Sequence, residues 1–146
     1  MSELLTGAEM PIYFPSDEWI KTMMVDLNNS DAYLDAAKNW EGDIFFIIQP
    51  GGKQEKPVTL YMDLFHGKCR SAFEVNGMEN PPKPVFEISA PIEKWKLVMT
   101  KKMDPMQALM TGQLRLRGNM AIIMRNVRAA KELVESCTRI DTEFPV

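Results

Sequence analysis

Apolar and polar positions form their clearest pattern in the last third of the chain. Asp104 can cap a short helix that begins at Pro105, because a proline ring suits the first position of a helix. We expect residues 111–112, Thr-Gly, to end this helix, and leucine then alternates with arginine over residues 114–117, as in a short strand with one buried face. Beyond Asn119, apolar residues at helical spacing predict one closing helix, whose stripe consists of Met120, Ile123, Met124, Val127, Ala130 and Val134.

The first half of the chain predicts two helices followed by three strands. Ser16 and Ser30 are of the type that commonly caps helices, and an apolar face follows each of them. The apolar run at residues 44–48 predicts a central strand with both faces covered. Residues 58–65 and 69–75 alternate between apolar and polar positions, and the short turn between them predicts a hairpin.

The middle of the chain supplies the remaining elements. A proline-rich loop at residues 76–84 is expected to carry the chain to a fourth strand at residues 85–90. Pro91 then opens a helix that has Ile92, Trp95, Val98 and Met99 on one face. The full order, α-βββ-crossover-β-α-β-α, predicts an α+β fold with about five strands in a mostly antiparallel or mixed sheet, covered by helices.

Length and composition favour a single domain. Of 146 residues, we expect 1–15 to form an N-terminal arm, 16–140 the domain and 141–146 a C-terminal tail. A hydrophobic fraction of 45% and a charged fraction of 25% are usual for a soluble protein. No apolar run is long enough for a membrane helix, no secretory signal is recognisable, and two distant cysteines make no disulfide framework. These features predict a reduced protein of the cytoplasm.

Charge is distributed unevenly along the chain. The net charge of −3 argues against a nucleic-acid partner, which usually requires a basic domain. Residues 1–90 carry seven Lys and Arg against 14 Asp and Glu, whereas residues 91–146 carry ten against six, a local excess of +4. This basic half forms either an ordinary mixed surface or a patch that binds an anionic headgroup or carboxylate.

Catalytic and metal-binding patterns are weak. Asp63, His66 and Cys69 are close in sequence, but His66 and Cys69 flank a tight turn, so a packed cysteine at a hairpin end is the better interpretation. A hydrolase or thioesterase that uses His66 therefore ranks last among the hypotheses. A single histidine without a Cys-x-x-Cys pair leaves zinc without ligands, and Gly51-Gly52-Lys53 lacks the spacing of a phosphate-binding loop. No cofactor is predicted.

Methionine is unusually frequent, with 12 residues in the chain. Methionine fills irregular gaps in cores, and it also lines surfaces that accept varied apolar molecules. The pattern therefore leaves two possibilities open, a soft core or a lipid-accepting cavity between helices and sheet. The methionines concerned are Met99, Met103, Met106, Met110, Met120 and Met124.

The segment from Asp104 to Met120 resembles the C-terminal signature of the sterol carrier protein 2 family. That signature consists of Asn/Asp-Pro, a short helix, Gly-Lys-Leu-Lys-Ile-x-Gly-Asn and a helix rich in Met and Leu; here Gln113 stands where Lys is usual. The order of elements also matches, so the resemblance covers about residues 16–140. It implies a non-enzymatic intracellular carrier that binds a fatty acid, an acyl-CoA or a sterol-like molecule in an apolar tunnel under the C-terminal helices.

The resemblance also implies which residues line the tunnel. Arg115 or Arg117 could meet the polar headgroup at its mouth. The alternative is an accessory or oligomerisation module that fills its own core and binds a partner enzyme. For either function we expect a monomer or homodimer with at most transient membrane contact. The expected lipid-binding residues are Trp95, Val98, Met99, Met106, Leu109, Met110, Leu114, Leu116, Met120, Ile123, Met124 and Val127.

Overall fold

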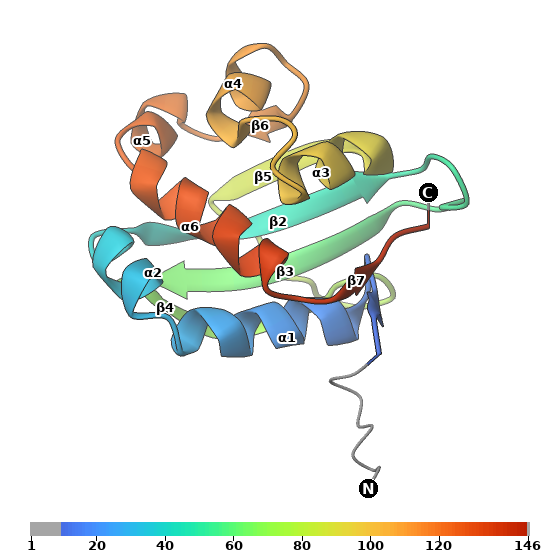
Figure 1. Ribbon diagram of the computed structural model, residues 1–146, viewed down its shortest axis with the longest axis horizontal. Coiled ribbons are helices and arrows are strands. Elements are labelled where there is room, and N and C mark those ends of the chain that lie inside the picture. Colours follow the sequence, from blue (N-terminus) through green and yellow to red (C-terminus); the bar gives the residue numbers. More distant parts are fainter. Residues whose placement is uncertain (1–9, 146) are drawn as a thin grey trace, which may run out of the picture.

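A five-stranded mixed sheet forms one layer of the computed structural model, which describes residues 10–145 (Figure 1). The strands lie in the order β4-β3-β2-β5-β6, so the apolar run predicted as the central strand is central. β2 pairs in parallel with β5, and the other neighbours are antiparallel. These findings confirm the predicted α+β fold. The strands are β2 (Glu41–Gln49), β3 (Val58–Phe65), β4 (Lys68–Glu74), β5 (Phe86–Pro91) and β6 (Arg115–Arg117).

The predicted hairpin and crossover are both present. His66 and Gly67 join β3 to β4 with φ angles of 49° and 80°, the left-handed conformation that a two-residue hairpin turn requires. The chain then crosses from the edge strand β4 to β5. Two hydrogen bonds fix this crossing, from the Thr59 amide to Asn76 Oδ1 and from the Val85 amide to Asp43 Oδ1, each at 2.8 Å.

Strand register creates one apolar face on the sheet. Ile44 lies opposite Met62 on β3 and Phe86 on β5, and Phe46 lies opposite Leu60 and Ile88. Side chains of directly paired residues point to the same face, so this face is apolar across three strands.

Helices cover that apolar face. The predicted caps hold: Ser16 and Ser30 accept hydrogen bonds from the Trp19 and Tyr33 amides, each at 3.0 Å. Asp104 accepts a bond of 2.9 Å from the Gln107 amide. Figure 1 shows α1, α3 and α6 lying across one side of the sheet. The helices are α1 (Asp17–Asn28), α2 (Asp31–Ala36), α3 (Ile92–Met99), α4 (Pro105–Met110), α5 (Met120–Met124) and α6 (Val127–Thr138).

The single closing helix expected from the pattern is wrong, because α5 and α6 are separated at Arg125 and Asn126. The Asn126 side-chain amide donates a hydrogen bond of 2.7 Å to the Ile122 carbonyl. Its backbone amide donates to the Ile123 carbonyl, one residue short of the α-helical partner. Asparagine commonly interrupts helices in this way, by offering the backbone a local side-chain partner. The apolar stripe therefore changes direction after Met124.

The described parts of the expected arm and tail form a second, two-stranded sheet. β1 (Ile12–Tyr13) pairs in parallel with β7 (Thr142–Glu143). Trp19 Nε1 donates a hydrogen bond of 2.9 Å to Thr142 Oγ1, which ties α1 to β7. Phe14 packs edge-on against Trp19 and Phe144, at centroid distances of 4.7 and 5.8 Å. Residues 1–9 and 146 lie outside the described part of the chain.

Candidate functional site

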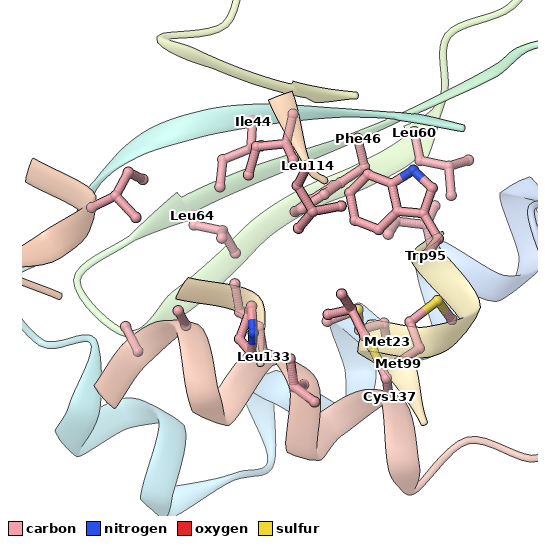
Figure 2. A pocket seen from close by; sticks show the side chains of 18 of the residues that line it. Met23, Ile44, Phe46, Leu60, Leu64, Trp95, Met99, Leu114, Leu133 and Cys137 are labelled. Carbon is pink, nitrogen blue, oxygen red and sulfur yellow. The ribbon is translucent and has the colours of Figure 1, made fainter. Parts of the chain in front are cut away.

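A cavity of about 120 Å³ lies between the sheet and the helices. Figure 2 shows Ile44, Phe46 and Leu60 of the sheet facing Leu133 and Cys137 of α6 across this space. The residues from α6 and the break before it are Asn126, Ala129, Ala130, Leu133, Val134 and Cys137. Those from the sheet are Ile44, Phe46, Leu60, Leu64 and Ile88.

The rest of the cavity wall comes from further regions of the chain. The wall includes Pro105 and Leu109 of α4, Leu114 and Ile123. The sides are formed by the residues at and around α1, α2 and α3: Phe14, Trp19, Ile20, Met23, Tyr33, Trp40, Trp95, Val98 and Met99. The cavity thus joins elements from nearly the whole length of the chain.

The wall of the cavity consists mostly of apolar side chains, and its three indole nitrogens already have hydrogen-bond partners. Trp19 donates to Thr142 Oγ1, Trp40 to the Gly42 carbonyl at 2.8 Å and Trp95 to the Ile47 carbonyl at 3.1 Å. Within residues 10–145, no buried side-chain nitrogen or oxygen lacks a hydrogen bond. Burial also raises the pKa of the Cys137 thiol to about 12, so this sulfur is uncharged at neutral pH. Such a wall offers apolar contact and carries no charged side chain.

Six of the twelve predicted lipid-binding residues line the cavity: Trp95, Val98, Met99, Leu109, Leu114 and Ile123. Met106 is buried in the core, while Leu116, Met120 and Val127 are half-buried and pack against it. Met110 and Met124 are 65% and 44% exposed. Each of these two is the last residue of a short helix, so the chain turns away before a longer stripe can develop. The methionines on the wall are Met99 and Met23, the second of which the sequence did not single out.

The two arginines considered for the headgroup lie on the opposite face of the sheet. Leu116 pairs with Ile88 on the apolar face, so its neighbours Arg115 and Arg117 point the other way. Arg117 is bonded to Glu87 on that outer face. The geometry therefore brings neither arginine to the cavity.

The prediction missed the wall contributed by α1, α2 and the sheet. Trp19, Ile20 and Met23 form a buried stripe in the pattern, and Phe46 lies within the apolar run, so both surfaces were visible as core. A pattern of buried positions does not indicate which of them face a void. That information arises only when the elements pack.

The rejected catalytic set is not assembled. Asp63 is bonded to Arg70 at 3.0 Å, and His66 Nε2 lies 2.6 Å from a Glu41 carboxylate oxygen. Burial raises the pKa of the Cys69 thiol to about 12, far from an activated thiolate. In the described part of the chain, no three His, Cys, Asp or Glu side chains are grouped to hold a metal ion. No helix within residues 10–145 is long and apolar enough to cross a membrane.

Residues 21–131 match the SCP-2 sterol transfer family. A crystal structure of sterol carrier protein 2 is 32% identical, with a TM-score of 0.74, and the match covers 86% of this chain and 97% of that chain. A solution structure of a conserved hypothetical protein from Thermus thermophilus, possibly a sterol carrier protein, is also 32% identical, with a TM-score of 0.76 and coverage of 86% and 88%.

The same fold occurs inside a much larger protein. A stereoselective inverting sec-alkylsulfatase from a Pseudomonas species is 13% identical, with a TM-score of 0.50. The match covers 89% of this chain and 17% of that chain, and it shows a shared fold alone. No curated protein matches this chain in sequence.

Proposed function

Because the chain belongs to the SCP-2 sterol transfer family, we propose that it is a non-enzymatic carrier of a fatty acid, an acyl-CoA or a sterol-like molecule. The apolar part of the lipid occupies the cavity between α6 and the sheet. The observation that carries this proposal is the apolar wall, in which every indole N–H already has a protein partner. The location in the cytoplasm stays a prediction from the sequence.

The energy of burial is sufficient for useful affinity. Each buried methylene contributes about 0.8 kcal/mol, so a chain of about 14 buried methylenes gains roughly 11 kcal/mol before the cost of ordering. Lost freedom of ligand and protein removes a large part of that gain. A dissociation constant in the micromolar range, which corresponds to a binding free energy of about −8 kcal/mol, is then reached without a headgroup contact.

The resting volume limits what fits without movement. An apolar cavity of about 150 Å³ stays dry and holds one benzene molecule, and this cavity is of similar size. A long acyl chain therefore requires the cavity to widen. The break between α5 and α6 is one place where the wall could move, because the regular helix hydrogen bonds are interrupted at Asn126.

Native mass spectrometry of the freshly purified chain, followed by organic extraction, tests the proposal. We expect a discrete adduct that extracts as a lipid and that a fluorescent fatty acid displaces. A clean mass of the protein alone, together with no uptake of the fluorescent fatty acid, would contradict the carrier function.

The second candidate is an accessory module that binds a partner enzyme or a second copy of itself. It is favoured by the occurrence of this fold within the larger sulfatase chain. In that case the cavity stays empty and the surface carries the function. A stable complex in size-exclusion chromatography with light scattering, combined with no lipid uptake, is the expected result for this candidate. A monomer that takes up lipid would exclude it.

A further inference from the structure

A second cavity adjoins the apolar one, at the place where α3, α6 and β7 meet. It has a volume of about 320 Å³ and lies at the surface, where Thr100 and Thr138 are exposed. Figure 1 shows α3 and α6 ending near each other at this place, with β7 following α6. We call this cavity the threonine pocket, and its lining residues are Met99, Thr100, Cys137, Thr138, Thr142 and Phe144.

Two side chains separate the threonine pocket from the apolar cavity. Met99 and Cys137 line both spaces, and Figure 2 shows them together at one end of the apolar cavity. Methionine is unbranched and flexible, so a rotation of the Met99 side chain can join the two spaces without a shift of the backbone. A molecule that fills the apolar cavity can therefore extend one end into the threonine pocket.

The threonine hydroxyls offer this pocket hydrogen-bond acceptors. Each donates its hydrogen to a backbone carbonyl, Thr100 at 2.7 Å, Thr138 at 2.6 Å and Thr142 at 3.0 Å. The Thr142 oxygen also accepts a bond from Trp19 Nε1. Because a hydroxyl has one hydrogen and two lone pairs, Thr100 and Thr138 keep only the capacity to accept. They suit a ligand group that donates a hydrogen bond.

Two helix ends favour the same kind of ligand group. Thr100 is the C-cap of α3 and Thr138 is the last residue of α6, so both helices end at the pocket. A helix C-terminus carries carbonyls without helical partners and the negative end of the helix dipole. Both features attract a donor and repel a carboxylate.

Neighbouring charges disfavour a cationic ligand group. Lys96 lies over the Phe144 ring, 5.4 Å from its centroid, and Lys101 follows Thr100 and is bonded to Glu135. These lysines already supply the positive charge that helix C-termini favour, so an added ammonium group would meet like charge. A neutral hydroxyl fits all of these conditions. We propose that the threonine pocket holds the hydroxyl end of an amphipathic alcohol whose apolar part lies in the cavity between α6 and the sheet.

The inference rests on the proposed carrier function and selects one class among its cargoes. Two ligands of equal chain length, 1-dodecanol and dodecanoate, are compared by their displacement of a fluorescent fatty acid. The double variant Thr100→Val/Thr138→Val keeps the shape of both side chains and removes both oxygens. A ligand hydroxyl donates one hydrogen bond, so the variant should bind 1-dodecanol about fivefold more weakly. Its affinity for dodecanoate should be unchanged or higher, which also shows that the variant is folded.

Two other threonines provide a matched control. Thr22 and Thr111 donate to the carbonyl four residues earlier, at 2.9 and 2.8 Å, as Thr100 does. Neither of them lines the apolar cavity or the threonine pocket. Thr22→Val/Thr111→Val should therefore bind both ligands within about twofold of the parent. Comparing one ligand between proteins cancels the different cost of taking each ligand out of water.

Three outcomes would overturn the inference. Equal losses for both ligands would show that the pocket does not recognise a hydroxyl, and a larger loss for dodecanoate would assign it to a carboxylate. No loss for either ligand would show that the cargo does not reach the pocket, while the carrier function stands. A parent protein that binds neither ligand and no fluorescent fatty acid would remove the carrier function and the inference together.

Discussion

Ile123 and Met124 are neighbours in α5, one buried and the other exposed, which makes them a matched pair. Ile123 is 6% exposed and lines the cavity, whereas Met124 is 44% exposed and does not. Ile123→Glu should lower the affinity for a fluorescent fatty acid about a hundredfold or more, because a carboxylate on the apolar wall has no partner. Met124→Glu should change it less than twofold.

An uncharged variant separates loss of binding from loss of folding. Ala130 lies on the cavity wall, so Ala130→Leu adds methylenes to the void. We expect weaker fatty-acid binding with an unchanged or higher melting temperature. Normal binding by both Ile123→Glu and Ala130→Leu would show that the lipid does not occupy this cavity.

Asp26 makes stability depend on pH, because it connects α1 to the end of α6. Its carboxylate accepts hydrogen bonds from Arg139 at 2.8 Å and from Ser136 at 2.7 Å. Burial alone would raise the pKa of Asp26, but the bonds from Arg139 and Ser136 outweigh it and hold the pKa below the ordinary 3.8. A pKa lowered by folding stabilises the protein above the unfolded value, and the contribution is lost as pH falls through the folded value.

Urea unfolding of Asp26→Asn measures that contribution. At neutral pH the free energy of unfolding should fall by about 1–3 kcal/mol, as for other hydrogen bonds to a charged group. As pH falls from 3.8 through the lower pKa of the folded protein, Asp26 becomes protonated in the folded state as well, and the difference between the variant and the parent should disappear. Asp141→Asn, at an exposed position, is the control and should track the parent at every pH. A difference for Asp26→Asn that is constant with pH would contradict this role.

Among the elements, the β1–β7 pair holds the two ends of the described part of the chain together beside the cavity. Phe144 packs on Phe14, which lines the cavity. Phe144→Ala should lower the free energy of unfolding by about 2 kcal/mol, less than the 3–5 of a fully buried ring, and should weaken lipid binding severalfold. Thermal melting and fatty-acid titration measure both effects. Glu143→Ala, at the neighbouring exposed position that ends β7, should change stability by less than about 0.5 kcal/mol.

Elements defined by local signals could be predicted from the sequence, and those defined by distant contacts could not. Ser16, Ser30 and Asp104 cap their helices as expected, because capping depends on residues within one turn. The β1–β7 pair joins residues about 130 positions apart, and no local pattern indicates it. The break at Asn126 has no neighbouring Gly or Pro that would indicate the end of a helix. The cavity wall also depends on contacts between distant elements. The predicted residues therefore include its part near α3–α5 and omit its part from α1, α2 and the sheet.

At the scale of the whole molecule, the cavity depends on the complete fold. Its wall includes Phe14 near one end of the chain and Cys137 near the other, so an unfolded chain has no binding site. Ligand that binds the folded state alone stabilises it by about 2.7 kcal/mol when its free concentration is 100 times the dissociation constant. For a domain of this size, the melting temperature should rise by about 10 °C. Absence of any shift, at saturating fatty acid and with Ile123→Glu as the negative control, would contradict binding inside the fold.

All three tryptophans of the chain, Trp19, Trp40 and Trp95, line the cavity. Indole emission responds to the polarity and packing of its immediate surroundings, and here every indole ring borders the same space. The chain therefore carries an optical reporter of its own occupancy. The wavelength or intensity of the tryptophan emission would change as a lipid enters or leaves the cavity. A ligand that absorbs in the near ultraviolet would quench all three indole rings by energy transfer. Loading and release could then be followed in real time on the unlabelled protein.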